Sequence, residues 1–290
     1  MKKLFSPFIK LYNKSSIWGK VLMFTMAIVL LVLFFKPQYK KVEGFELTND
    51  FNIKVGTNVY DDFYSNIYDN LVFKDLYDNY EYGELLNKTG PTSRSIVLDV
   101  GSGTGDGVAD LAKQGYKVIG IDSSPSMIKK AKEKYPKYDF KLADALNATE
   151  FQPNSFTHIL CMFFTLYEMQ NKEAFFKNCM RWLMPGGFLI LQLVDRDTIP
   201  SSSNNPVFNP SDFEYNTKFI VNKDNNTAIF EEKIKTKDGK VRKNEHHLYM
   251  EDRDEIIQMA QEAGFDLFGA GEMKQTEYGY QYVYILRKSN

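Results

Sequence analysis

A run of eleven residues, VLDVGSGTGDG from Val97 to Gly107, constrains the fold of this chain more than any other stretch. It opens with apolar residues around Asp99, and four glycines follow within seven positions. Glycine has no Cβ, so such a turn lets the backbone approach a ligand closely and adopt left-handed conformations. We therefore expect a buried strand that passes through a tight turn into a helix, with a ligand at the helix N-terminus.

Strand signals and helix signals alternate on both sides of this turn. The strand signals are 95–100, 116–121, 138–142, 156–164 and 188–194, and the helix signals are 108–114, 125–134 and 171–183. Such alternation is typical of parallel strands joined by right-handed helical crossovers, in a sheet covered on both faces. A helix signal at 251–263 and strand signals at 265–270 and 280–288 complete a Rossmann-like α/β fold.

The pattern changes between residues 195 and 250, where we expect an inserted subdomain. Three strand-like runs lie there, at 213–222, 227–236 and 240–250. They are separated by KDNN and KDG, which suit tight turns. The sequence therefore predicts an antiparallel β-meander inserted into the α/β domain.

An amphipathic run from Val59, VYDDFYSNIYDNLVFKDLYDNYEYGELL, precedes the alternating region. Its apolar residues recur mostly at spacings of three and four, as on the buried face of a helix. These positions are Tyr60, Phe63, Tyr64, Ile67, Tyr68, Leu71, Leu76 and Tyr77. We expect one helix that ends before Gly90 and Pro91.

Residues 17–35, IWGKVLMFTMAIVLLVLFF, form an apolar stretch close to the roughly 20 residues that a membrane-spanning helix needs. Lys20 and Trp18 suit the membrane interface. A buried core helix would show a polar face, and a cleaved signal peptide would continue into small residues rather than into FFKPQYKK. We predict one uncleaved transmembrane helix, after a basic tail at 1–16 and before a linker at 36–50.

Charge is unevenly distributed along the chain. Eight of the 36 basic residues and none of the 37 acidic residues lie before residue 42, which leaves 28 basic against 37 acidic residues in the rest. Nucleic-acid binding needs a basic surface that displaces counterions, so we expect no nucleic-acid partner. Cys161 and Cys179 lack metal-ligand spacing, and we expect buried free thiols, with no disulfide and no metal site.

Two acids separate the ligand classes that bind a glycine-rich turn. A dinucleotide-binding turn has a third glycine where this chain has Asp106, a poor neighbour for a pyrophosphate. Asp99 lies inside the strand, two positions before Gly101, where it would repel an anion and attract a cation. The turn therefore favours a cationic adenosyl cofactor over a nicotinamide dinucleotide.

The motif VLDVGSGTG, from Val97 to Gly105, resembles the first motif of the class I S-adenosylmethionine (SAM)-dependent methyltransferases. The resemblance covers roughly residues 60–288. It implies a Rossmann-like sheet of seven strands that binds SAM as cofactor. The PGG turn at 185–187 and the closing pair of strands fit the same family.

The resemblance also implies roles for individual residues. Asp99 and the glycine backbone would hold the methionyl part of SAM, and Asp122 would accept hydrogen bonds from both ribose hydroxyls. Asp144 would bind the adenine amino group, with the backbone of Ala145 nearby and Met127 packed on the ring. Taken singly, Asp122 and Asp144 also fit surface acids at strand ends. The predicted cofactor residues are Asp99, Gly101, Ser102, Gly103, Gly105, Asp122, Ser123, Met127, Asp144 and Ala145.

The methyl acceptor is less constrained, because the methyl group of SAM is already activated and no catalytic motif is obligatory. The loop after the fourth strand reads CMFFTLYEM and lacks the NPPY-type motif, which disfavours nucleic-acid and protein-glutamine methylation. The helix VYDDFYSNIYDNL and the meander ending NEHHLYM resemble small-molecule N-methyltransferases that act on amino sugars or glycine-like amines. We therefore expect a small amine as acceptor.

This second resemblance implies the candidate catalytic residues Tyr64 and His246. Tyr64, with Tyr60 beside it, would meet the methionyl end of SAM. Either His246 or His247 would face the substrate as a base or an anchor, since neighbours on a strand point to opposite faces. Helix packing is the alternative role for the tyrosines, and a structural role is the alternative for the histidines.

The predicted anchor leaves two other functions open. A membrane-bound lipid or quinone-like molecule is an alternative acceptor, and a non-catalytic cofactor-binding or assembly protein is a third reading. Lysines around residues 17–35 weakly favour a cytosolic N-terminus, which would place the main domain outside the cytosol. SAM is made in the cytosol, so we expect a single-pass membrane protein whose domain lies on a SAM-containing side.

Overall fold

A computed structural model of the protein describes residues 16–20, 25, 51–72, 86–199, 202–203, 213–273 and 281–289. The chain divides into two units, Met1–Asn49 and Asp50–Asn290. No helix in the described ranges is long and apolar enough to cross a membrane. Most of the helix predicted at 17–35 lies outside these ranges, as do the predicted linker and all but the last residue of the predicted tail.

The second unit contains a seven-stranded sheet with the strand order β11-β12-β6-β5-β2-β3-β4. Neighbouring strands from β6 to β4 are parallel, and β12 is antiparallel to both β6 and β11. This confirms the predicted α/β fold with seven strands. The strands are β2 (Ile96–Val100), β3 (Lys117–Asp122), β4 (Asp139–Leu142), β5 (Phe156–Cys161), β6 (Leu183–Val194), β11 (Phe265–Glu272) and β12 (Gln281–Lys288).

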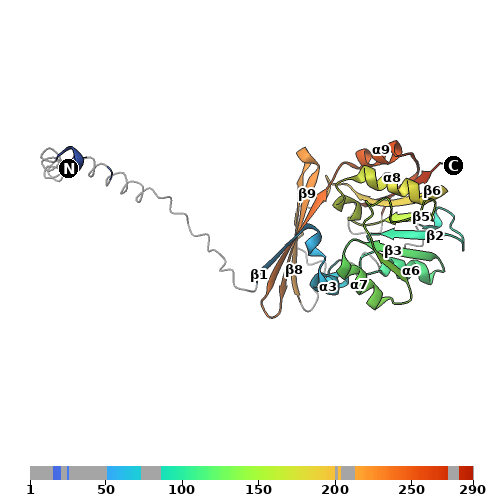
Figure 1. Ribbon diagram of the computed structural model, residues 1–290, viewed down its shortest axis with the longest axis horizontal. Coiled ribbons are helices and arrows are strands. Elements are labelled where there is room, and N and C mark those ends of the chain that lie inside the picture. Colours follow the sequence, from blue (N-terminus) through green and yellow to red (C-terminus); the bar gives the residue numbers. More distant parts are fainter. Residues whose placement is uncertain are drawn as a thin grey trace. The chain divides into compact units, whose positions relative to one another are not determined.

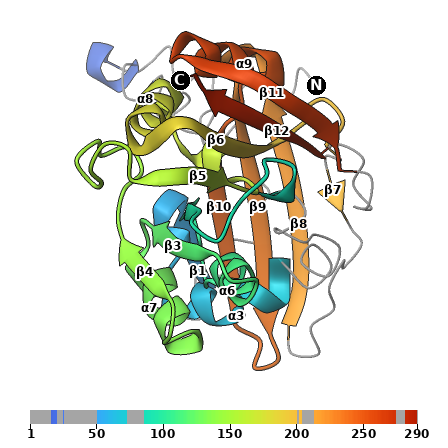
Figure 2. The same ribbon diagram turned by 90° about the vertical axis from the view of Figure 1, so that its right-hand side faces the viewer.

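Helices cover both faces of this sheet (Figure 2). They are α6 (Asp106–Lys113), α7 (Pro125–Lys134), α8 (Lys172–Trp182) and α9 (Arg253–Glu262). Leu189 and Leu191 of β6 pack in one buried cluster with residues of α8 and α9. Ile190, between them, packs in another cluster with residues of α6 and α7. Because alternate strand residues face opposite sides, both faces must be apolar, which explains the continuous apolar run in the sequence.

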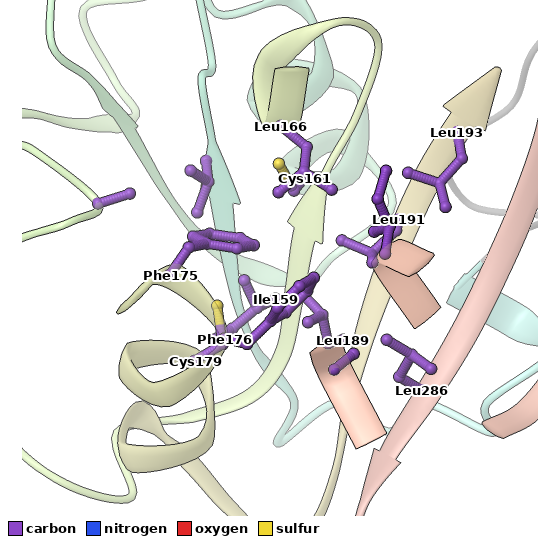
Figure 3. Packing of buried hydrophobic residues seen from close by; sticks show 14 of the residues in the cluster. Ile159, Cys161, Leu166, Phe175, Phe176, Cys179, Leu189, Leu191, Leu193 and Leu286 are labelled. Atoms are coloured by element: carbon purple, nitrogen blue, oxygen red, sulfur yellow. The ribbon is translucent and has the colours of Figure 1, made fainter. Parts of the chain in front are cut away.

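The larger cluster lies between β5, β6 and α8. Figure 3 shows Phe175 and Phe176 of α8 beside Ile159 of β5 and Leu189 of β6, and all four are 0% exposed. Burying a side chain of this size stabilises the fold by about 1.5–3 kcal/mol relative to exposure. Both cysteines are buried and free. The core thus holds rigid the strands whose carboxyl ends carry the site described below.

A second sheet of five strands, ordered β1-β10-β9-β8-β7, belongs to the same unit. Its strands are β1 (Phe51–Val55), β7 (Ser202–Ser203), β8 (Phe213–Asn222), β9 (Thr227–Thr236) and β10 (Val241–Tyr249). Figure 1 shows β1, β8 and β9 in a layer of their own beside the larger sheet. The antiparallel run β8-β9-β10 confirms the predicted meander. The parallel pairing of β1 with β10 was not expected, because five residues carry little periodicity.

Three segments differ from the prediction by more than two residues at a boundary. The amphipathic run begins with a 3-10 helix, η1 (Gly56–Val59), and continues as α3 (Asp62–Val72), while residues 73–85 lie outside the described residues. Strand β5 ends at Cys161 because Phe163 takes a left-handed conformation. Strand β6 begins before the PGG turn, which forms a bulge between the pairs Phe156–Leu183 and His158–Phe188.

Candidate active site

A cavity of about 390 Å³ lies at the carboxyl ends of β2, β3, β4 and β5, next to α3 and the five-stranded sheet. Its volume is in the range of small-molecule pockets. In open α/β sheets, ligands bind outside the carboxyl ends of the strands. This cavity lies at that position. Its lining comes from the glycine turn, the ends of β3 and β4, the loop after β5, and the inward faces of β9 and β10.

The glycine turn depends on backbone conformations that other residues rarely adopt. The φ angles of Gly101, Gly103 and Gly105 are 73°, 54° and 93°. A Cβ on Gly101 would lie 2.4 Å from the Thr165 side chain, and a Cβ on Gly105 would lie 2.6 Å from the Phe140 ring. Gly105 is a predicted cofactor residue, but it does not line the cavity. Its close contact with Phe140 packs the turn against β4.

Hydrogen bonds join the turn to the end of β3. The N–H groups of Gly101 and Ser102 both donate to the carbonyl of Ile121, at 2.8 and 2.9 Å. The N–H of Gly103 donates to Asp122 Oδ2 at 3.0 Å. These amides are engaged within the protein. The turn therefore offers a ligand close backbone approach, and not the free N–H donors of an anion site.

Asp99 and Asp122 make this end of the cavity acidic. Burial raises the pKa of Asp99 to about 7, and the charge of Asp122 adds to this effect. Burial also raises the pKa of Asp122, although the N–H groups of Ser124 and Gly103 favour its charged form. A cation beside two carboxylates stabilises their ionised forms. This end of the cavity is therefore suited to a positively charged ligand.

The next part of the lining is held in place by neighbouring helices. Met127, which is 1% exposed, donates its N–H to the Oγ of Ser124, the N-cap of α7, at 3.1 Å. Asp144 follows β4 and lines the cavity. The side chain of Asn178 on α8 donates to the carbonyl of Ala145 at 2.9 Å and anchors this loop. Helix capping thus positions Met127, and packing positions the loop of Asp144 and Ala145, which are the residues predicted to contact adenine.

The structure brings nine of the ten predicted cofactor residues to one cavity. Those that line it are Asp99, Gly101, Ser102, Gly103, Asp122, Ser123, Met127, Asp144 and Ala145. Gly105 is the exception, for the packing reason given above. The role of each residue in cofactor binding stays a prediction.

A buried acid–base pair borders the cavity from the five-stranded sheet. His246 Nε2 lies 2.8 Å from Glu232 Oε2, and the side chains are 6% and 0% exposed. Glu232 also accepts hydrogen bonds from Asn244 Nδ2 at 2.9 Å, from the Tyr64 hydroxyl at 2.9 Å and from the Tyr215 hydroxyl at 2.5 Å. Burial alone would raise the pKa of Glu232, but its bonds to His246 and the other donors outweigh burial and lower it. Glu232 is therefore a buried carboxylate with several donors.

The orientation of His246 follows from this carboxylate. An ionised carboxylate only accepts hydrogen bonds, so His246 presents Nε2–H to Glu232. Its Nδ1 lies 3.3 Å from the Tyr60 hydroxyl and 4.0 Å from Glu168 Oε1. Burial alone would lower the pKa of His246, but Glu232 and then Glu168 outweigh it and raise the pKa.

A chain of polar contacts extends from His246 to the loop after β5. The Tyr60 hydroxyl donates to Glu168, the last residue of η2 (Thr165–Glu168). Burial raises the pKa of Glu168, against the bond from Tyr60. Glu168, Tyr60 and His246 all line the cavity. We call the four residues Glu168, Tyr60, His246 and Glu232 the polar chain.

The two predicted catalytic residues have different positions. Tyr64 lines the cavity, but its hydroxyl donates to Glu232, so it is Tyr60 whose hydroxyl contacts Glu168. His246 lines the cavity, whereas His247 is exposed and points to the opposite face of β10. The sequence left both histidines open, and strand geometry selects His246.

Glu168 and Glu232 were missed by the sequence analysis. Glu232 occupies an inward position of β9, in line with the buried Ala228 and Ile234. A charged residue at an inward position of an amphipathic strand must be paired. The glutamate at this position of the sequence pattern could therefore have indicated a buried polar site. Glu168 carried no such signal, because its loop lacks periodicity.

Arg242 on β10 holds residues 59–61 against the five-stranded sheet. Its Nη1 lies 2.8 and 3.0 Å from the two carboxylate oxygens of Asp61, and its Nη2 donates to the carbonyl of Val59 at 2.7 Å. Its Nε donates to Asn244 Oδ1 at 2.7 Å. The same strand therefore positions His246 and the segment that carries Tyr60.

Comparison with known proteins identifies the domain. Residues 97–187 match a family described as a methyltransferase domain. The demethylmenaquinone methyltransferase of Tropheryma whipplei (strain Twist) is 34% identical over 123 residues, which are 42% of this chain and 51% of that protein. The chain thus spans about half the length of this curated relative.

Two solved structures share the fold over most of the second unit. The CcbJ methyltransferase from Streptomyces caelestis has a TM-score of 0.67 at 20% identity, over 80% of this chain and 98% of that chain. SAM-bound CalS10, an amino pentose methyltransferase from Micromonospora echinaspora, has a TM-score of 0.58 at 17% identity, over 78% and 97%. At these identities the likeness concerns the fold alone.

Proposed function

This chain contains a SAM-dependent methyltransferase domain with SAM as its cofactor, and we propose that the whole protein transfers a methyl group from SAM to an amine nitrogen of a small molecule. The observation that carries the proposal is the polar chain. It places Glu168, Tyr60 and His246 on the same cavity as the glycine turn. A group that binds an ammonium ion and a group that accepts its proton would thus lie beside the cofactor.

The residues of the cavity fit SAM. SAM carries a sulfonium and an ammonium group, and desolvation raises the pKa values of the buried Asp99 and the partly buried Asp122, which a cation would counteract. Each carboxylate oxygen of Asp122 accepts one N–H bond and keeps a lone pair for a ribose hydroxyl. Asp144 and Met127 would hold the adenine, as the family resemblance implies. When bound, SAM supplies an activated methyl group.

The polar chain would prepare the amine. An amine is a nucleophile only as the free base, so an ammonium substrate must first lose a proton. Glu168 would attract the ammonium group, and His246 Nδ1 would accept the proton. The imidazolium formed would donate Nε2–H to Glu232 and Nδ1–H to the Tyr60 oxygen, which lies 3.3 Å away. The neutral amine would then be held in line with the methyl group in a site from which water is excluded.

Titration calorimetry tests the cofactor step. SAM and S-adenosylhomocysteine would be titrated into the full-length protein, with Asp122→Ala as the test variant and Asp110→Ala on α6 as the control. We expect binding by the wild type and the control, and loss of binding in Asp122→Ala. A folded wild type that binds neither ligand would contradict SAM binding and would leave only a non-catalytic assembly role.

Transfer of a labelled methyl group tests the acceptor. Wild-type protein and His246→Gln would be assayed with a panel of small amines, amino sugars and extracted lipids. We expect transfer to amines, lowered roughly 10²–10⁴-fold in His246→Gln, the usual contribution of an acid–base group. Equal transfer by wild type and His246→Gln would contradict the assigned base.

We propose a lipid or quinone-like acceptor as the second candidate. It is supported by the apolar sequence at 17–35, which we propose as a single-pass anchor, and by the name of the Tropheryma whipplei relative. Labelled lipid products with no labelled amines would favour it. Protease protection in intact membranes would test whether the domain faces a SAM-containing compartment, as we propose.

A further inference from the structure

Two buried glutamines line the cavity from β6 and β12. Gln192 is 2% exposed and Gln281 is 5% exposed. Gln192 pairs in register with Val283, two residues after Gln281, so the two side chains lie on the same face of the sheet. Neither residue takes part in the polar chain. Two carboxamides buried at a cavity need a reason, because burial of an unpaired amide is costly.

Hydrogen bonds assign the oxygen and nitrogen atoms of both amides. The N–H of Phe163 donates to Gln192 Oε1 at 2.9 Å, and a peptide N–H can only donate. Gln192 therefore presents its Nε2 to Gln281, whose Oε1 accepts at 2.6 Å. We call these two hydrogen bonds, from Phe163 to Gln192 and from Gln192 to Gln281, the relay. The peptide N–H of Phe163 fixes the orientation of both amides, so the oxygen and nitrogen atoms cannot be exchanged. It leaves Gln281 Nε2, with two N–H donors, pointing away from Gln192.

The nitrogen of Gln281 is open to a ligand. Among the described residues, no acceptor contacts Gln281 Nε2. Gln281 Nε2 is also not among the solvent-inaccessible side-chain atoms without a hydrogen-bond partner in the described part of the chain, so this unpartnered nitrogen is accessible to solvent. Since Gln281 lines the cavity, its donors face space that a bound molecule can enter.

Phe163 provides a second reason to connect this relay with binding. Its φ angle is 55°, which is unusual for a bulky residue and indicates backbone strain. Such strain tends to occur at functional sites. The bond to Gln192 holds the loop in this conformation, and the same loop carries Glu168 into the cavity.

We propose that Gln281 Nε2 binds an oxygen atom of the methyl acceptor, and that Gln192 is a positioning residue that orients it. The acceptor is then an amine that also carries a hydroxyl, carbonyl or carboxylate oxygen. Glu168 and His246 would bind its nitrogen, and Gln281 its oxygen. This inference rests on the proposed amine methylation and adds a specificity-determining residue to it.

The test compares matched amines in the labelled-methyl assay. Ethanolamine carries a hydroxyl where propylamine carries a methyl group, and 2-aminocyclohexanol differs from cyclohexylamine by one hydroxyl; all four amines would be used with the full-length protein. Wild type should methylate an oxygen-bearing amine with kcat/KM roughly tenfold above that of its apolar match, the value of one hydrogen bond. The Gln281→Glu variant retains an acceptor for Gln192 but loses its donors, and should abolish this preference. Gln152→Glu, at an exposed position outside the cavity, should keep it.

Gln192→Glu tests the positioning role. Its carboxylate can still accept from Phe163 but cannot donate to Gln281. We expect the same loss of preference as in Gln281→Glu, an unchanged Kd for SAM, and no further loss in the double variant. Additive losses would contradict the relay.

The outcomes separate this inference from the proposed function. Amine methylation that ignores the oxygen atom, or that is unchanged in Gln281→Glu, overturns the inference alone. Weaker SAM binding by Gln281→Glu with unchanged acceptor preference would assign the donors to the cofactor and also overturn it. Absence of methyl transfer to every amine by a SAM-binding wild type overturns both.

Discussion

His246 and Glu232, on neighbouring strands of the five-stranded sheet, form a hydrogen-bonded pair in which Nε2 and Oε2 lie 2.8 Å apart. The pair should make stability depend on pH and, through the proposed role of His246 as a base, activity as well. Burial opposes the charged form of His246, but Glu232 outweighs burial and raises the pKa of the imidazole above its ordinary value of 6.5. The stability that this adds is fully present below pH 6.5 and is lost as pH rises through the raised pKa.

The pH–rate profile is the first prediction. A base must be neutral to accept a proton, so kcat/KM should rise with pH through the raised pKa of His246. In Glu232→Gln the carboxylate charge is lost, and the midpoint should move to lower pH. Glu231→Gln, the neighbour that faces the other side of β9, is the matched control and should leave the midpoint unchanged. A midpoint that stays in place in Glu232→Gln would contradict the pairing.

The affinity for SAM should depend on pH through Asp99. The pKa of Asp99 is about 7 without ligand, and a cation favours its charged form. Below pH 7 SAM binding must therefore expel a proton, and Kd should decrease several-fold between pH 6 and pH 8. Calorimetry at both pH values should show this for wild type and Asp144→Asn. Asp99→Asn should bind more weakly and show a smaller dependence on pH.

Two glycines with the same backbone conformation should respond differently to alanine. Gly105 and Gly115 have φ angles of 93° and 94°, but only Gly105 has a neighbour, the Phe140 ring, within 3 Å of an added Cβ. The left-handed conformation alone costs about 1–2 kcal/mol for alanine. Gly115→Ala should lose about that much unfolding free energy, and Gly105→Ala clearly more. Urea unfolding measures both, and equal losses would show that the ring moves away freely.

The Arg242 contacts should stabilise the segment that carries Tyr60. Arg242→Met removes the bonds to Asp61 and Val59 and should lower the unfolding free energy by about 2 kcal/mol, typical of bonds to a charged group. The KM for the acceptor should also rise, because Tyr60 lies between Val59 and Asp61. Arg94→Met, at an exposed position, is the control. Thermal unfolding and steady-state kinetics provide the two readouts, and a normal KM with lowered stability would limit Arg242 to a structural role.

Local patterns in the chain were sufficient for the seven-stranded sheet, for the meander and for most of the predicted cofactor residues. The spans of β8, β9 and α7 agree with the prediction to the residue, because their periodicity and caps are properties of short segments. The glycine turn and the acids Asp99, Asp122 and Asp144 lie at strand ends. Parallel strands bring their carboxyl ends to one edge, so sequence order already implied that these residues meet.

The part of the cavity that we propose for the acceptor depends on contacts between distant segments. Tyr60 meets Glu168 across 108 residues and His246 across 186 residues, and no local period encodes such a meeting. The direction of each amide in the relay from Phe163 to Gln281 likewise depends on which partner lies opposite in space. Packing of the five-stranded sheet against the seven-stranded one brings these groups together. Their contacts could therefore be identified only from the tertiary structure.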